Sequence, residues 1–332
     1  MTLKEQKLVY YLTQAGLEGR DIIWDQNYRH NLAIRKSFEQ IYTTYQGDKQ
    51  SQDWANFEVY MKRVWFANGI HHHYSNAKMK PAFSADYLQS LLIDTGATLT
   101  SDAFAVLFND KDAKKVNLTK DVDNVLLSAV NFYGPGVTTA DVENFYKAKT
   151  SPDPKRPLSY GLNSQLVKQD GVLTERVYKS GGLYGAAIDK IIGWLEKAKA
   201  VAENQAQGEA LGLLISYYKT GDLQTWDDYN VAWTSATDGN IDYINSFIEV
   251  YNDPAGYRGS YETVVQIKDF EMSQKMAVLS ENAQWFEDNS PLMQAHKKAN
   301  VVGVTYKVVD VAGEAGDASP STPIGVNLPN AN

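Results

Sequence analysis

Three of the five histidines in the 332-residue chain stand side by side, at positions 71 to 73. Neutral imidazole binds zinc readily, but a zinc site needs three or four ligands that converge from one side. Adjacent side chains do not converge, because they alternate between the faces of a strand and fan around a helix. At most two could share one ion, and His30 and His296 stand outside any His-Glu-x-x-His spacing. We therefore expect the triplet to line a turn or a cleft wall and not to bind a metal.

Two further patterns were weighed as chemical sites. The glycine-rich stretch 179–190, KSGGLYGAAIDK, precedes a predicted helix whose first N–H groups could hold an anion. It has neither the Walker nor the Rossmann spacing, which favours a tight loop entering a helix. The paired carboxylates Asp227 and Asp228 are typical of a solvated helix face. The chain has no cysteine and no Gly-x-Ser-x-Gly segment, which excludes thiolate nucleophiles, cysteine-bound zinc and a serine nucleophile of that type.

The last segment, STPIGVNLPNAN, offers groups that an extended peptide could use. Pro323 prevents an ordinary central strand, and Gly325 lets another backbone approach closely. Asn327 and Asn330 place amide groups on either side of a rigid proline. One interpretation is a sheet edge to which a peptide adds as a strand. The other is an irregular loop whose asparagines cap its own backbone, and the pattern alone leaves both open.

Charge and hydropathy limit the possible partners. Lys and Arg number 32 against 40 Asp and Glu, a net charge of -8, and no long basic run occurs. Nucleic acid and anionic membranes are therefore excluded as favoured partners. The first residues, MTLKEQKLVYYL, are charged where a signal peptide is apolar, and no apolar run approaches 18 residues. We expect a soluble chain, cytoplasmic as written, or periplasmic if a signal precedes it.

Apolar residues recur at helical spacing through most of the chain. This spacing predicts helices over 22–45, 84–92, 138–148, 185–218 with a break near 205–208, the segments around Trp226 and Ile244, and 271–289. Alternation of apolar and polar residues instead predicts strands over 260–269 and 301–312. Helices that are followed by a few late strands indicate an α+β fold, not a βαβ alternation.

Four segments occur here in the order in which similar segments occur in one enzyme family. They are WFANGIHHHYS, YKSGGLYGAAI, FIEVYNDPAGYRGSYE and PIGVNLPN. The chain thereby resembles the dipeptidyl peptidase III family of zinc-dependent exopeptidases over roughly residues 20–330, and its triple histidine is most similar to the bacterial branch. The resemblance implies that His71–His73 are a family marker in the substrate lobe.

The resemblance also implies what this sequence lacks. The family binds Zn²⁺ through His-Glu-x-x-Gly-His and a later glutamate, and none of this occurs in the 332 residues. In the family that motif follows the GVNLPN segment. We therefore expect an N-terminal portion of the enzyme, starting after the usual family N-terminus, with Zn²⁺ as the cofactor of the full-length parent and none in this portion. Such a portion is expected to be inactive alone.

Site residues follow from the resemblance at matched positions only. Glu249 resembles the carboxylate that holds the α-amino group of an oligopeptide substrate, and Asn327 and Asn330 resemble its amide partners. Tyr251 resembles the tyrosine whose hydroxyl donates to the developing oxyanion. Asn252 stands where other members often carry arginine, so no role is carried over to it. Three residues resemble the edge strand that pairs with the peptide backbone: Pro323, Ile324 and Gly325.

The family fold implies two lobes around a cleft, with a five-stranded mixed β core in the substrate lobe. We expect residues 1–247 to be the mainly helical part of that lobe and 248–269 with 301–332 to be its β core. Residues 270–300 then form a helical excursion toward the missing zinc lobe of the same chain. Two alternatives are a non-catalytic peptide-binding or protein-interaction module and an unrelated helical scaffold.

Overall fold

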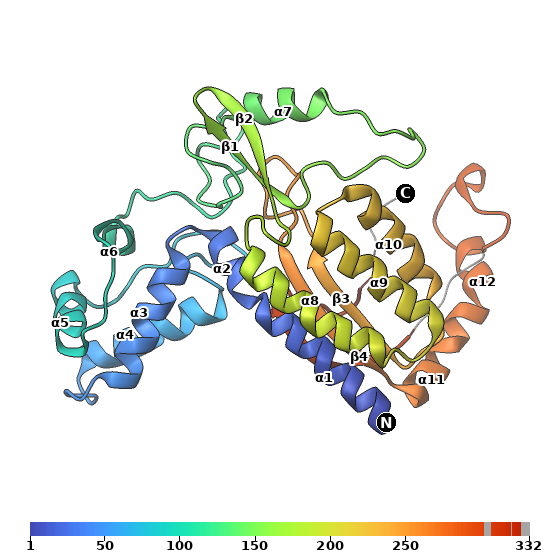
Figure 1. The fold of residues 1–332 in the computed structure, drawn as a ribbon, viewed down its shortest axis with the longest axis horizontal. Coiled ribbons are helices and arrows are strands. Elements are labelled where there is room, and N and C mark those ends of the chain that lie inside the picture. Colours follow the sequence, from blue (N-terminus) through green and yellow to red (C-terminus); the bar gives the residue numbers. More distant parts are fainter. Residues whose placement is uncertain (302–306, 320, 327–332) are drawn as a thin grey trace.

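The computed structural model describes residues 1–301, 307–319 and 321–326. Its described part is mostly helical, with two small antiparallel sheets, which confirms the predicted α+β class. Figure 1 shows a helical region formed by early residues on one side and a sheet covered by helices on the other. None of the helices in these described residues is long and apolar enough to cross a membrane.

The N-terminal helices form because capping residues precede apolar faces. Their bounds are α1 Leu3–Glu18, α2 Arg20–Asn27, α3 Asn31–Thr44, α4 Gln52–Phe66, α5 Ala85–Thr95 and α6 Ser101–Phe108. Thr2, Ser51, Ser84 and Thr100 each accept a hydrogen bond from a backbone N–H of the first turn. The predicted helix 22–45 is interrupted after Asn27, so α2 and α3 form a pair. Their buried faces join those of α4, α5 and α6 in one hydrophobic core.

A β-hairpin follows α7 (Thr139–Lys147) and was missed by the sequence analysis. Its strands are β1 (Ser164–Gln169) and β2 (Val172–Val177). Asp170 and Gly171 form its turn, with φ of 50° and 81°. Two consecutive positive φ values at an Asp-Gly pair are the mark of a type I′ hairpin turn. That dipeptide was the signal available in the sequence.

A second core lies where three further helices pack together with α1. The helices are α8 (Gly185–Ala200), α9 (Gln205–Thr220) and α10 (Leu223–Ser235). The break predicted near 205–208 lies at residues 201–204 instead, and Asn204 caps α9. Figure 1 shows α1, α8 and α9 crossing one side of the sheet, and their apolar side chains share a core with its inward residues.

The larger sheet has the strand order β3-β4-β5 and is antiparallel in the part of the chain that the structure describes. Its strands are β3 (Ile241–Phe247), β4 (Tyr261–Lys268) and β5 (Val309–Gly316). The strand predicted over 260–269 is confirmed as β4. The helix predicted around Ile244 is wrong, because this segment is β3. Six of its seven residues are buried, so no alternation of polar residues marks it as a strand.

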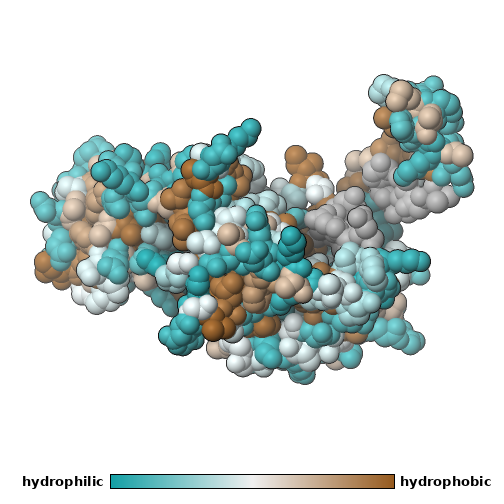
Figure 2. Space-filling view, turned by 90° about the horizontal axis from the view of Figure 1, so that it is seen from above, coloured by the Kyte–Doolittle hydropathy of each residue, from teal (hydrophilic) through white to brown (hydrophobic). Residues whose placement is uncertain are grey.

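The chain leaves the sheet between β4 and β5 for α11 (Phe270–Glu281), α12 (Ala283–Asp288) and a 3₁₀ turn (Gln294–His296). This α11–α12 arm buries only Ser273 among its helical residues. Figure 2 shows it as a knob that projects from the body of the molecule. Its two ends are fastened together, since Asp269 N donates to Val308 O at 2.9 Å and Val308 N donates to Ser273 Oγ at 2.9 Å.

Candidate functional site

A polar cavity of about 430 Å³ lies beside the sheet. Six parts of the chain contribute to it: the end of α2, the α4–α5 connection, the segment after α6, the β3–β4 loop, the start of β4 and the residues that follow β5. Its described lining consists of Asn27, Ala67, Asn68, His73, Tyr74, Asn76, Lys115, Tyr251, Asn252, Glu262, Asp317, Ala318, Ser321 and Pro323. We call it the carboxylate cavity, because the carboxyl groups of Glu262 and Asp317 line it. Predicted site residues Tyr251 and Pro323 thus lie in one cavity with residues that the sequence analysis did not select.

Tyr251 is held over this cavity by Asp317. Its hydroxyl donates a hydrogen bond to Asp317 Oδ2, although 62% of the residue remains exposed. Asn252 Nδ2 donates to both Asp317 oxygens at 3.1 Å and to Ser260 Oγ at 3.0 Å. The phenol is therefore directed at a carboxylate and remains largely exposed to solvent.

Gly316 sets the position of Asp317. Its φ is 74°, and a Cβ atom there would stand 2.1 Å from Tyr261 O. Only glycine fits such a left-handed position so close to another backbone. The turn lets Asp317 N donate to Tyr261 O at 2.9 Å, which brings the Asp317 side chain below the β3–β4 loop.

Glu262 is a carboxyl group in an apolar and acidic environment. It is 7% exposed, and its Oε2 has no hydrogen-bond partner in the described part of the chain. Burial raises its pKa to about 8, and the neighbouring carboxylates of Asp317, Glu249 and Glu314 act in the same direction. Glu262 is therefore mostly neutral at pH 7, in a place where an incoming cation favours its charged form.

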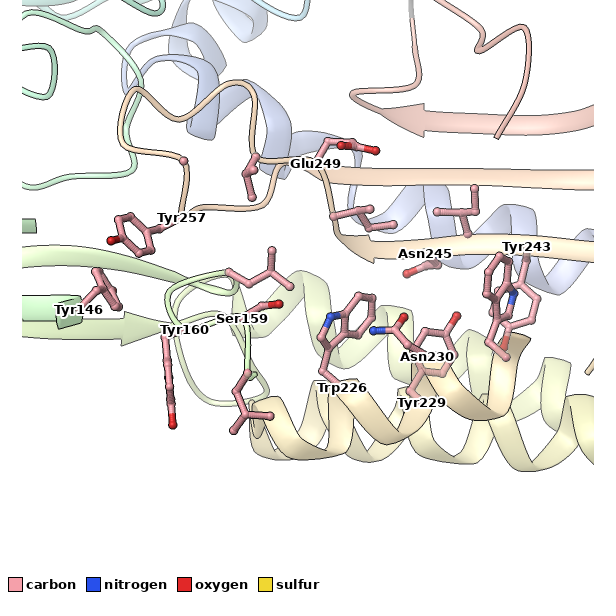
Figure 3. Close-up of a pocket in the computed structure, with 17 residues that line it drawn as sticks. Tyr146, Ser159, Tyr160, Trp226, Tyr229, Asn230, Tyr243, Asn245, Glu249 and Tyr257 are labelled. Atoms are coloured by element: carbon pink, nitrogen blue, oxygen red, sulfur yellow. The ribbon is translucent and has the colours of Figure 1, made fainter. Parts of the chain in front are cut away.

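Glu249 lies between the carboxylate cavity and a second cavity. The second cavity holds about 410 Å³, and we call it the aromatic cavity, because its lining includes the rings of Tyr146, Tyr160, Trp226, Tyr229, Trp233, Tyr243 and Tyr257. Figure 3 shows the Glu249 carboxylate across the strands from the rings of Trp226 and Tyr229. Glu249 is itself a lining residue of this second cavity, and its charge also raises the pKa of Glu262 in the carboxylate cavity.

The structure places the C-terminal site residues only in part. Pro323 lines the carboxylate cavity, and the Ile324 side chain is fully exposed. Nothing lies within 4 Å of a Cβ built on Gly325, and residues 321–326 form no strand. Asn327 and Asn330 lie outside the described residues.

The three adjacent histidines have three different environments. His71 is 1% exposed, its Nε2 lies 2.9 Å from Ala113 O, and its ring meets Tyr28 edge to face. His72 is exposed, and its Nδ1 accepts from the backbone N–H groups of Tyr74 and Ser75. His73 lines the carboxylate cavity. The rings of His72 and His73 stack with their centroids 5.0 Å apart, but no group of three or more His, Cys, Asp or Glu side chains that could hold a metal occurs among the described residues.

The sequence analysis missed Asp317, Glu262 and Lys115. A weak signal was present for Glu262, the one acidic residue of the strand YETVVQIK. Lys115 and Asp317 stand in irregular segments with no motif around them. Only the fold brings these residues together with Tyr251.

Comparison with known proteins agrees with this architecture. The solved structure of DPP III from Caldithrix abyssi superposes with a TM-score of 0.69 at 20% identity, covering 99% of this chain and 52% of that one. Dipeptidyl peptidase 3 of Homo sapiens is 30% identical over 149 residues, which cover 45% of this chain and 20% of that protein. Dipeptidyl peptidase 3 of Dictyostelium discoideum is 21% identical, over 99% of this chain and 50% of that protein.

The fold is that of the dipeptidyl peptidase III structures. The model of peptidase family M49 matches residues 160–332, and the chain belongs to that family of peptidases, as the resemblance in its four segments predicted. The chain spans about half the length of the Dictyostelium relative and of the Caldithrix structure.

Proposed function

We propose that this chain is the substrate-binding portion of a zinc-dependent dipeptidyl peptidase, which removes dipeptides from the N-termini of oligopeptides. The observation that carries the proposal is the carboxylate cavity, where Glu262 and Asp317 lie beside the Tyr251 hydroxyl. A free α-ammonium group is the feature that distinguishes a peptide N-terminus from an internal segment. Carboxyl groups in a partly buried cavity are suited to bind it by charge-assisted hydrogen bonds.

In this proposal Glu249 and Tyr251 have different roles. The Glu249 carboxylate holds the substrate ammonium and thereby fixes which peptide bond is presented. The Tyr251 hydroxyl exchanges its hydrogen bond to Asp317 for one to the carbonyl oxygen as that oxygen gains charge. Asn327, Asn330 and the segment from Pro323 to Gly325 bind the peptide backbone.

The described residues do not fit a zinc site, because no ligand set is gathered among them. We therefore place the zinc of the whole enzyme outside this sequence and derive no step through it. The chain alone is then inactive as a peptidase. Residues 1–269 and 301–332 form the substrate lobe, whose β core includes β3 (Ile241–Phe247) and therefore begins earlier than the predicted residue 248. The α11–α12 arm extends toward the zinc lobe across a cleft.

A titration of this chain with two tetrapeptides tests the proposal. Tetra-alanine with a free N-terminus should bind, and N-acetylated tetra-alanine should bind at least 10-fold more weakly, because acetylation removes the ammonium charge. Glu249→Gln should remove most of that difference. Glu209→Gln, a change at an exposed residue of α9, is the matched control and should preserve it.

A second candidate function is a non-catalytic peptide-binding module. The feature that favours it is the aromatic cavity, which presents rings and no basic side chain among its described lining residues. Such a module binds internal peptide segments, so the two tetrapeptides would bind equally. That result would contradict the peptidase proposal.

A further inference from the structure

The carboxylate cavity contains a cation as well as its acidic groups. Lys115 is 3% exposed and lines this cavity together with Tyr251, Glu262 and Asp317. No hydrogen bond and no ion pair holds its ammonium group within the described part of the chain. The nearest opposite charge that acts on it is Asp317.

Hydrogen bonds fix the backbone at Lys115, and its side chain lines the cavity from this position. Lys115 N donates to Asn76 O at 2.9 Å, and Lys115 O accepts from the N–H groups of Ala129 and Val130 at 3.1 Å. Only 3% of Lys115 is exposed, so its stem is covered by protein, unlike that of a surface lysine. Its burial lowers its pKa, while the Asp317 carboxylate opposes that effect.

A buried ammonium group without a partner is costly, and so is a buried carboxyl oxygen without a donor. The cavity contains one of each, at Lys115 and at Glu262 Oε2. These two groups do not pair with each other, since no ion pair joins them. A ligand that carries both an ammonium and a carboxylate would satisfy both groups at once.

We propose that the carboxylate cavity binds a free dipeptide as a zwitterion, with its ammonium among the carboxyl groups of Glu249, Glu262 and Asp317 and its carboxylate on the Lys115 ammonium. This inference rests on the proposed function, since it concerns the product of that reaction. The cavity volume of about 430 Å³ is within the range of about 300–1,000 Å³ that small-molecule sites occupy.

Hydrolysis itself creates the group that Lys115 binds. Water adds its oxygen to the scissile carbonyl carbon, the carbon–nitrogen bond breaks, and the departing nitrogen takes both protons of the water and leaves as an ammonium group. The dipeptide keeps the new carboxylate, where the substrate had a neutral carbonyl. A cation attracts a carboxylate more strongly than a carbonyl, so Lys115 retains the product more than it binds the substrate.

Two small ligands that differ only at the carboxyl end test this inference on the chain itself. Alanyl-alanine carries the carboxylate, and alanyl-alaninamide carries a neutral amide in its place. In calorimetric titrations at pH 7 and low salt, we expect the free dipeptide to bind at least 10-fold more tightly. The comparison needs no variant, so it does not depend on whether a mutated chain folds.

Variants of Lys115 then assign the difference to one side chain. Lys115→Met keeps the length of the stem and removes the charge, so both ligands should bind equally, at the affinity of the amide. Lys115→Arg should restore part of the preference. Lys114→Met is the matched control at the exposed neighbour and should behave as the wild type.

The outcomes separate this inference from the proposed function. Equal affinity of the two ligands for the wild-type chain, or an undiminished preference in Lys115→Met, would overturn the role of Lys115 and leave the ammonium site standing. If neither ligand binds while tetra-alanine does, the dipeptide proposal fails alone. If none of the three binds, both proposals fail.

Discussion

Replacing His71 should change how the stability of the protein depends on pH. His71 is buried and its Nδ1 has no hydrogen-bond partner in the described residues. Its pKa is lowered from 6.5 to about 4, chiefly by burial and to a smaller extent by the cations of Lys115 and Lys78. The hydrogen bond to Ala113 O and the Asp112 carboxylate oppose this shift without cancelling it.

The sign of the effect follows from proton binding. Between pH 6.5 and about 4 the unfolded chain carries a proton on His71 that the folded chain does not. The free energy of unfolding therefore falls as the pH falls through this window. For one such group, proton linkage lowers the free energy of unfolding by about 2 kcal/mol at pH 5 relative to pH 8. Below pH 4 this loss approaches a limit of about 3 kcal/mol.

Urea unfolding at pH 5, 6, 7 and 8 measures this loss. His71→Asn should be less stable than the wild type at pH 8, because a packed imidazole is lost, and that deficit should shrink by about 2 kcal/mol at pH 5. Subtracting the free energy of unfolding of His71→Asn from that of the wild type at each pH removes the contribution of titrating groups that both proteins share. The same substitution at exposed His72 should leave the pH dependence of the wild type unchanged. A deficit of His71→Asn that is the same at all four pH values would refute the reasoning.

Three other predictions concern the cavity and the arm. In an enzyme that joins this chain to a zinc-binding lobe, Tyr251→Phe should lower kcat roughly 10²-fold and leave KM nearly unchanged; wild-type kcat on a dipeptidyl arylamide would refute the oxyanion role. Binding of alanyl-alaninamide at pH 7.5 should release up to about one proton, because the ammonium group of the ligand lowers the raised pKa of Glu262. Calorimetry in buffers of different ionisation enthalpy measures the number of protons released. Glu262→Gln should abolish the release. Trp285 and Phe286 are 59% and 50% exposed on the arm, so the chain should self-associate at high concentration. Trp285→Lys should shift the sedimentation profile toward the monomer. An unchanged profile would contradict self-association through the arm.

The predictable parts of the fold are those with local signals. Ser84 and Thr138 begin helices where a capping residue precedes an apolar face, and Gly221 ends α9 with a φ of 72°. The strand β3 has no such local signal. It is buried on both faces and its isoleucines recur at three- and four-residue intervals, so its pattern is that of a buried helix until β4 pairs with it.

The site was predictable to the extent that a motif carries it. Glu249 and Tyr251 stand in a recognisable segment; Tyr251 lines the carboxylate cavity and Glu249 lines the aromatic cavity, and the roles of both stay predictions. Lys115 and Asp317 come from parts of the sequence about two hundred residues apart. Their chemistry depends on burial and on one another, and neither property can be predicted from local residue spacing.

The fastening of the α11–α12 arm has a consequence for how this protein can vary. Because Asp269 and Val308 are bonded to each other, and Lys268 pairs with Val309, the β4–β5 register closes before the arm begins. The arm is thus an insertion into a hairpin, and its length is not dictated by the sheet. Residues can be added to it or removed from it without shifting Glu262 against Gly316. Related proteins that share this sheet can therefore differ in the length of the arm while the cavity beside the sheet keeps its geometry.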